Sequence, residues 1–312
     1  MARARVMRID RKVISTWQEA LSDFILSRQA MGLSPRTIND YQQHVKLFFS
    51  RYPDAWNPSN LKRAVMMHMS HPVAPATFNN RRKYLKIFFN WCMEEGIFPE
   101  NPLSRVPKKR DEGRIRDIKA EVLERLMSLP NKKTYTGLRD YALILLSLDI
   151  GIRPREALSL LVSDVDLEGK TVTIRREISK TRKTSILPIT EPVVNALKKL
   201  VHVRHPVWDK DAPLFCTRDG TPLTVRRWEA RLKKYSDILG TSVTPYDLRH
   251  GFATLFLRDG GNVYALQKIL RHSSMDMVRR YLQFNDEDIR RQHELASPVV
   301  RLLTKTPRVG KI

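Results

Sequence analysis

Hydrophobic side chains recur every three or four positions through most of the first hundred residues, which is the spacing of one helix face. Thr16 suits the N-cap of the first such segment, and Ser34 suits the N-cap of the second. Two further segments with the same spacing follow at residues 59–70 and 77–95. This part of the chain is therefore predicted to be all-helical.

The second part of the chain mixes helical and alternating patterns. Residues 171–177 and 184–189 alternate apolar and polar side chains, as strands do, and residues 179–183 between them are expected at a hairpin tip. A further short strand is expected near Leu214. Helices are predicted at residues 120–128, 138–148, 191–203 and 224–239. The expected fold class is α+β, mainly helical with a small antiparallel sheet in the C-terminal domain.

These patterns divide the chain into five parts. A stretch with two prolines, one glycine and several cations has no apolar stripe, which is typical of a linker. The predicted parts are a basic arm at 1–13, a helical domain at 14–100, a basic linker at 101–117, a second domain at 118–285 and a tail at 286–312.

The net charge of the chain indicates which class of partner it binds. The chain has 56 Lys and Arg against 33 Asp and Glu, a formal net charge of +23. Such a surplus favours a polyanion, and nucleic acid is preferred here over an anionic membrane surface. The helix at 77–95 carries a cationic cluster that is either a solvated face or a contact with DNA phosphates, and we favour the second. The DNA-binding residues predicted here and in the linker are Arg81, Arg82, Lys83, Lys86, Lys108, Lys109 and Arg110.

Other classes of protein are disfavoured. Cys92 and Cys216 are the two cysteines, too few for a disulfide framework or a four-cysteine zinc site. No apolar run reaches the length of a membrane span, and the basic start lacks the apolar core of a signal peptide. We expect a cytoplasmic protein that uses no metal and no cofactor.

Candidate chemistry gathers near the end of the second domain. Arg249-His250 and Arg271-His272 are two Arg-His pairs, and Tyr281 follows nine residues after the second histidine. An enzyme that cuts a phosphodiester without metal needs fixed cations around the growing negative charge, and a tyrosine hydroxyl can serve as the nucleophile. Taken singly, each residue also has a structural interpretation, since Tyr281 lies among apolar neighbours and His272 could cap a helix.

Two further cations precede this stretch. Arg153 follows the strongly apolar helix at 138–148 and stands beside the first turn of a new helix, so it is either a rigidly held arginine or a surface one. Lys180 lies at the predicted hairpin tip, where a lysine can reach a phosphate or be basic by chance.

Together these residues resemble the tyrosine recombinase (phage integrase) family, in its simple two-domain type. The likeness covers about residues 12–285, and the stretch GLSPRTINDY is similar to the family's helical core-binding domain. Each motif is weak alone, but their order and joint presence are specific. The matching motifs are GIRPRE at 151–156, Lys180 in the hairpin, DLRHGFAT at 247–254, LRHSS at 270–274 and Tyr281.

The resemblance implies a mechanism. Tyr281 would attack a DNA phosphate, form a 3′-phosphotyrosyl bond and free a 5′-hydroxyl, with no ATP. Arg153 and Arg249 would bind the non-bridging oxygens, because a guanidinium can donate two parallel hydrogen bonds to a phosphate. Lys180 would protonate the leaving oxygen. His272 and Tyr246 would hydrogen-bond the phosphate or assist proton movement, and Glu156 would support neighbouring groups.

Two departures bear on the site. Tyr246 stands where the family most often has histidine, which leaves a hydrogen-bond donor but puts a proton-transfer role in doubt. Arg271 replaces the usual glycine and adds either a phosphate contact or a surface charge.

The resemblance also implies partners. The expected partner is double-stranded DNA, bound by a homo-tetramer, or a tetramer with a paralogue, on two DNA sites. Residues 286–312 would dock on a neighbouring protomer or fold back on their own domain. The role would be integration, excision or resolution of DNA.

Two other functions stay open. A type IB topoisomerase-like enzyme would share the covalent chemistry, although the separate helical domain favours a recombinase. A DNA-binding accessory protein with a disabled site would form no covalent adduct with DNA.

Overall fold

The computed structural model describes residues 14–111, 118–208, 211–282 and 286–302. It divides the chain into two compact units, Met1–Gly113 and Arg114–Ile312. The predicted basic arm lies outside the described residues, as do the last part of the predicted linker and the end of the tail. No helix in the described ranges is long and apolar enough to cross a membrane.

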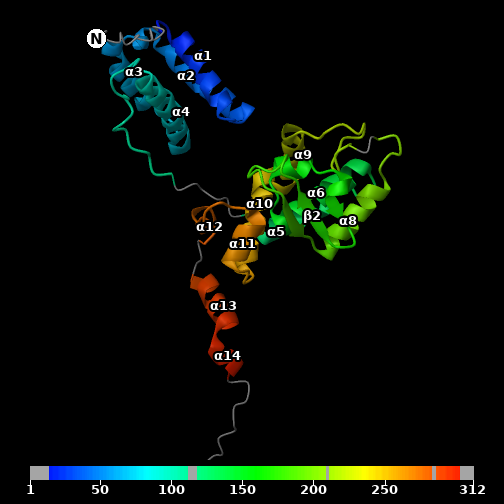
Figure 1. Ribbon diagram of the computed structural model, residues 1–312. Coiled ribbons are helices and arrows are strands. Elements are labelled where there is room, and N and C mark those ends of the chain that lie inside the picture. The colour runs from blue at the N-terminus through cyan, green and yellow to red at the C-terminus, as the bar shows by residue number, and fades with distance from the viewer. Residues whose placement is uncertain (1–13, 112–117, 209–210, 283–285, 303–312) are drawn as a thin grey trace, which may run out of the picture. The chain divides into compact units, whose positions relative to one another are not determined.

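The first unit is helical, as its pattern predicted. Thr16 and Ser34 cap the first two helices by accepting hydrogen bonds from the backbone N–H groups of Glu19 and Thr37, both at 3.2 Å. Five phenylalanines at no more than 1% exposure form the centre of its core, namely Phe24, Phe48, Phe49, Phe88 and Phe89. The helices are α1 (Trp17–Ala30), α2 (Pro35–Arg51), α3 (Pro58–Ser70) and α4 (Pro75–Glu94), with the 3-10 turn η1 (Pro53–Trp56) between α2 and α3 (Figure 1).

The first residues of the predicted linker pack on α4. Leu103 is fully buried in the core of the first unit. Asn101 donates to the backbone carbonyl of Lys86 at 2.8 Å, and the backbone N–H of Lys109 donates to Asn79 at 3.0 Å. Residues 101–109 therefore follow the surface of this unit instead of extending freely.

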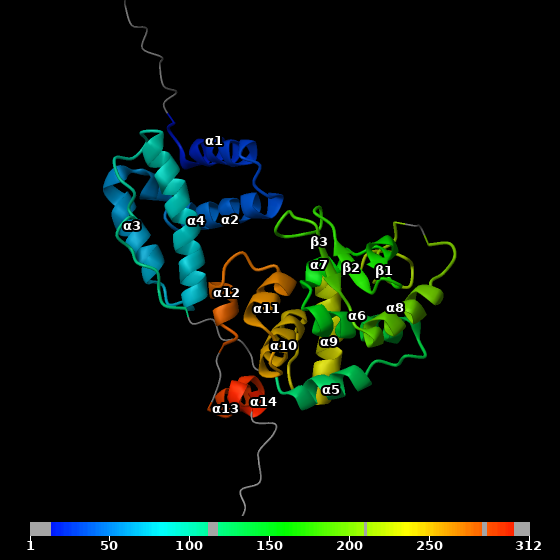
Figure 2. The same cartoon turned by 60° about the horizontal axis from the view of Figure 1, so that its bottom comes forward.

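The second unit is mostly helical and has a small sheet at one end, as Figure 2 shows. Its three strands are antiparallel in the order β1-β2-β3, with Val172 opposite Leu187. The strands are β1 (Val165–Asp166), β2 (Thr171–Ile174) and β3 (Ser185–Pro188), with the 3-10 turn η2 (Val162–Asp164) before β1. The helices are α5 (Ala120–Ser128), α6 (Tyr135–Ile150), α7 (Pro154–Leu158), α8 (Glu191–His202), α9 (Val225–Leu239), α10 (Pro245–Arg258), α11 (Val263–Leu270), α12 (Asp276–Arg279), α13 (Asp286–Ala296) and α14 (Pro298–Leu302). The predicted fold class, mainly helical with a small antiparallel sheet, is confirmed.

Two strands differ from the prediction. β2 ends at Ile174 because the next residues form a turn, closed by hydrogen bonds from the N–H groups of Ile178 and Ser179 to the carbonyl of Arg175. The strand expected near Leu214 is replaced by two isolated antiparallel bridges, one between Leu161 and Pro213 and one between Cys216 and Pro222. An alternating pattern does not reveal a local turn that satisfies the same backbone groups.

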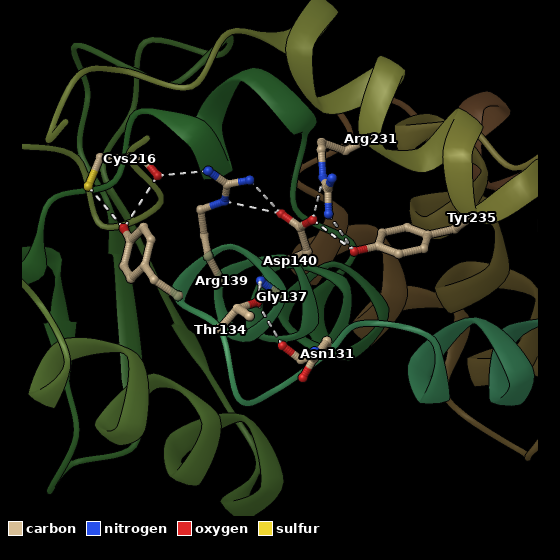
Figure 3. A network of polar contacts seen from close by, with 9 residues as sticks. Asn131, Thr134, Gly137, Arg139, Asp140, Cys216, Arg231 and Tyr235 are labelled. Atoms are coloured by element: carbon tan, nitrogen blue, oxygen red, sulfur yellow. Dashed lines mark hydrogen bonds and ion pairs between the residues drawn. The ribbon is translucent and has the colours of Figure 1, made fainter. Parts of the chain in front are cut away.

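A buried carboxylate joins α6 to α9 (Figure 3). Asp140 is fully buried, and one of its oxygens accepts hydrogen bonds from Arg139. The other accepts from Arg231 at 2.8 Å and from the hydroxyl of Tyr235 at 2.9 Å. Arg139 also donates to the carbonyl of Cys216 at 3.0 Å. Because a buried charge is costly unless paired, this network fixes the start of α6, whose other end leads into the site.

Candidate active site

The end of α6 positions the first arginine. Gly151 ends the helix in the left-handed region with φ of +55°, and a Cβ there would lie 2.5 Å from Phe252 and 2.7 Å from Leu270. Only glycine suits this conformation and this close approach. Arg153 then occupies the N-cap position of α7, with a side chain 13% exposed.

Glu156 connects three parts of the site. It is 2% exposed, and its Oε1 accepts hydrogen bonds from Arg153 Nη1 and from the backbone N–H of Lys180, both at 3.1 Å. Its Oε2 is ion-paired with Arg271. One buried carboxylate therefore holds α7, the β2–β3 hairpin and the residue after α11 together, while the side chain of Lys180 stays exposed.

Arg249 is buried at 4% exposure on α10. It donates to the carbonyls of Gly151 and Leu270, and its Nη2 lies 2.8 Å from His272 Nε2. Burial, and then the nearby charge of Arg153, lowers the pKa of Arg249 to about 10, which still leaves the guanidinium charged at neutral pH.

The contact with Arg249 also sets the tautomer of His272. A guanidinium can only donate, so His272 Nε2 must accept. Burial and the charge of Arg249 lower the pKa of His272 to about 4, so the ring is neutral near pH 7 and carries its proton on Nδ1. His272 Nδ1 has no hydrogen-bond partner within the described residues. It is therefore a buried donor that lacks a partner among the described residues.

Tyr281 lies directly beyond α12 and is 7% exposed. Its ring packs with Val278 and Leu270 in a small apolar cluster, and it stacks on the ring of His272 at 6.5 Å between centroids. Its hydroxyl lies 2.8 Å from His250 Nδ1. Burial raises the pKa of the Tyr281 phenol, and the charges of Arg249, Arg280 and Arg153 oppose that rise. The tyrosine is thus both an apolar packing residue and a neighbour of the arginines.

Tyr246 and Arg271, the two departures that bear on the site, lie in different surroundings. Tyr246, on the first turn of α10, is 53% exposed and makes no hydrogen bond from its side chain within the described ranges. Arg271 is 9% exposed and has φ of +53°, a region that glycine tolerates at less cost. Its pairing with Glu156 shows that it is a buried partner and not a surface charge.

The predicted DNA-binding cations belong to the first unit, and some of them have structural partners. Arg82 donates to the carbonyl of Val106, and Lys86 donates to that of Ser104 at 3.4 Å. Lys109 lies over the ring of Phe78 at 4.4 Å. The side chains of Lys83, Lys108 and Arg110 are exposed, and Arg81 is half-buried.

His250 is the residue that sequence reasoning missed. The sequence shows it only as the neighbour of Arg249 and predicts no role for it. The only signal was its adjacency to that arginine, because the contact with Tyr281 joins residues 31 positions apart. No group of three or more His, Cys, Asp or Glu side chains in the described ranges could hold a metal ion.

Comparison with known proteins shows the family to which this chain belongs. The model of the phage integrase family matches residues 116–288, more than half of the chain. The chain belongs to the phage integrase family. The predicted resemblance to tyrosine recombinases is therefore confirmed.

Two of its curated relatives are tyrosine recombinases named XerC. Tyrosine recombinase XerC of Roseiflexus castenholzii is 30% identical over 72% of this chain and 73% of its own length. Tyrosine recombinase XerC of Shewanella amazonensis is 25% identical over 92% of this chain and 97% of its own length.

Solved structures share the fold. The crystal structure of XerA recombinase is 25% identical, with a TM-score of 0.51, over 90% of this chain and 99% of that one. The Tn1549 transposon integrase in complex with transposon right end DNA is 20% identical, with a TM-score of 0.72, over 90% and 99% of the two chains. This second likeness supports the fold alone.

Proposed function

We propose that this protein is a site-specific DNA recombinase that cuts and rejoins DNA strands through a 3′-phosphotyrosyl intermediate on Tyr281. The observation that carries the proposal is the joint position of five side chains. Arg249 binds His272, the ring of His272 stacks on Tyr281, and Glu156 holds Arg153. Family membership supports this function over the topoisomerase-like alternative.

In this proposal Arg153 and Arg249 bind the non-bridging oxygens of the phosphate. Their guanidinium groups are anchored by Glu156 and by backbone carbonyls, so they are already fixed where negative charge grows. His272 donates from Nδ1. Lys180 protonates the leaving 5′-oxygen, reaching it from the exposed hairpin tip. Tyr246 supplies at most a hydrogen bond, because its exposed side chain has no anchor.

We further propose double-stranded DNA as the partner and the cytoplasm as the location. Support comes from the net charge of +23 and from relatives that are named recombinases. The basic residues of the first unit and of the linker would contact phosphates. A homo-tetramer, or a tetramer with a paralogue, on two DNA sites would bring four strands together.

The tail supports an assembly of this kind. α13 packs on its own chain, where Gln292 donates to the carbonyl of Leu257 at 3.1 Å. Even so, Ile289, Leu295, Val299 and Leu302 remain more than half exposed. We propose that the tail docks on a neighbouring protomer, which buries exposed side chains of this set.

The deciding experiment uses a nicked suicide duplex that carries the target site. Wild-type protein is expected to form a covalent protein–DNA adduct, and mapping the cleavage position identifies the site. Tyr281→Phe should bind the same DNA and form no adduct. A wild-type protein that binds DNA without any adduct would favour the accessory-protein alternative, and relaxation of plasmid that lacks any specific site would favour the topoisomerase.

A further inference from the structure

His250 contacts the atom that the proposed reaction needs to activate. Its Nδ1 lies 2.8 Å from the hydroxyl oxygen of Tyr281, and the two ring centroids are 5.6 Å apart. His250 follows Arg249 on α10, so the helix that places the arginine also places this histidine. Within the described residues, no other side chain hydrogen-bonds the Tyr281 hydroxyl.

At rest both groups are in the protonation states from which a transfer from oxygen to nitrogen starts, and attack on phosphorus has to drive it against both pKa shifts. Burial raises the pKa of the Tyr281 phenol, which therefore keeps its proton until attack. Burial lowers the pKa of His250, and so do Arg249 and Arg280, while Asp247 opposes them. A neutral imidazole offers one nitrogen with a lone pair, and the phenol hydroxyl faces Nδ1.

The other candidates for this role are occupied or distant. His272 accepts from Arg249 at Nε2 and carries its proton on Nδ1, so neither nitrogen is available as an acceptor. Tyr246 is 53% exposed and hydrogen-bonds none of the described side chains of the site. Glu156 is already held by Arg153, Arg271 and the N–H of Lys180.

We propose that His250 is a catalytic residue that orients the Tyr281 hydroxyl and accepts its proton during attack on DNA. This inference rests on the proposed function. The bond between Tyr281 Oη and phosphorus forms, the bond from phosphorus to the 5′-oxygen breaks, and the phenolic proton moves to His250 Nδ1. The leaving 5′-oxygen takes a proton from Lys180. Rejoining reverses each step.

The test compares two variants with wild type in single-turnover cleavage of the nicked suicide duplex. His250→Phe keeps a ring and loses the acceptor, and His250→Asn keeps an acceptor that is not basic. Both are expected to slow adduct formation by about 100-fold, as loss of a general base does. DNA affinity and melting temperature are measured for both. His202→Asn changes an exposed histidine on α8 and should leave the rate unchanged.

A second substrate separates this role from protonation of the leaving group. A duplex with sulfur in place of the bridging 5′-oxygen has a leaving group that needs no proton. Lys180→Ala should be slow on the normal duplex and fast on this one. The His250 variants should stay slow on both, because the phenol must still lose its proton.

Failure of the His250 proposal and failure of the proposed function give different results. Either His250 variant cleaving within threefold of wild type overturns the proposal, and so does rescue of both variants by the sulfur duplex. Absence of any wild-type adduct would overturn the proposed function itself, whatever the variants do.

Discussion

At the scale of single residues, Arg271 combines an unfavourable backbone with a favourable side chain. A non-glycine residue in the left-handed region costs about 1 kcal/mol, or somewhat more. The side chain offsets this cost by pairing with Glu156, whose other cationic partner among the described residues is Arg153. The resemblance alone left a phosphate contact and a surface charge as the choices for Arg271, and the structure shows an internal ion pair.

Two substitutions separate the backbone cost from the ion pair. Arg271→Met removes the pair and keeps the strain, so the free energy of unfolding should fall by about 3 kcal/mol. Arg271→Gly removes both and should lose about 1 kcal/mol less. Urea denaturation followed by circular dichroism measures the difference. A glycine variant less stable than the methionine variant would contradict this explanation.

His68 is a second buried residue, and its protonation affects the stability of the fold. It is 1% exposed, against the ring of Phe48, and neither ring nitrogen has a partner within the described residues. Burial lowers its pKa to about 4, with help from the charges of Arg81 and Arg51. The unfolded chain, with a histidine pKa of about 6.5, therefore binds more protons than the folded one between these values.

This shift predicts acid sensitivity. Stability should be complete above about pH 6.5 and fall by up to about 3 kcal/mol as pH drops towards 4. His68→Phe should remove most of that slope, because phenylalanine fits an aromatic core and does not titrate. Denaturation midpoints from pH 4 to 8 provide the measurement, with His202→Phe as the exposed control. An unchanged slope in the His68 variant would show that other groups cause it.

At the scale of elements, α4 uses its cations in two ways. Arg82 and Lys86 hold residues 104–106 of the following segment by their backbone carbonyls. Lys83 projects to solvent, over the ring of Tyr84 at 5.2 Å. A helix face that reads as uniformly basic in the sequence is therefore divided between packing and a surface available to phosphate.

This division predicts different effects for neighbouring residues. Lys83→Gln should weaken DNA binding, reduce the slope of log affinity against log salt by about 1, and leave stability unchanged. Arg82→Gln should lower the free energy of unfolding by about 1 kcal/mol through the lost hydrogen bond. Fluorescence anisotropy at several salt concentrations and urea denaturation measure the two effects. Equal losses of stability in both variants would contradict the assignment.

At the scale of the whole molecule, the tail contains two different pieces. α13 is tied to the end of α10 through Gln292, and Asp288 pairs with Arg258 at 3.9 Å. α14 follows with exposed Val299 and Leu302. The first piece belongs to its own chain, and the second has the character of an element that lacks its partner.

Truncation tests the proposed docking. Deleting residues 286–312 should abolish synapsis of two DNA sites and leave binding to one site intact. Deleting 298–312 keeps α13 and should have the same effect if α14 makes the contact. Gel-shift assays with one and two sites distinguish the complexes. Recombination at the wild-type rate by the longer truncation would refute docking in trans.

Local sequence patterns were enough to predict most of the longer helices and the chemical types of the site residues. Capping residues and apolar periodicity act within a few positions, so the starts of α1 and α2 and the full extent of α5 were predicted directly. The order of the arginine, histidine and tyrosine motifs indicated the family, and the comparison with the family model confirmed it. The assignment of roles to these residues stays a proposal.

Which of these side chains meet depends on the folded chain. It turned Arg271 inward to Glu156, left Tyr246 exposed, and brought His250 to the Tyr281 hydroxyl. Each outcome depends on contacts between residues far apart in the chain, and local patterns carry no information about such contacts. Packing and burial fixed these positions, because a buried charge or hydroxyl must find a partner wherever the fold supplies one.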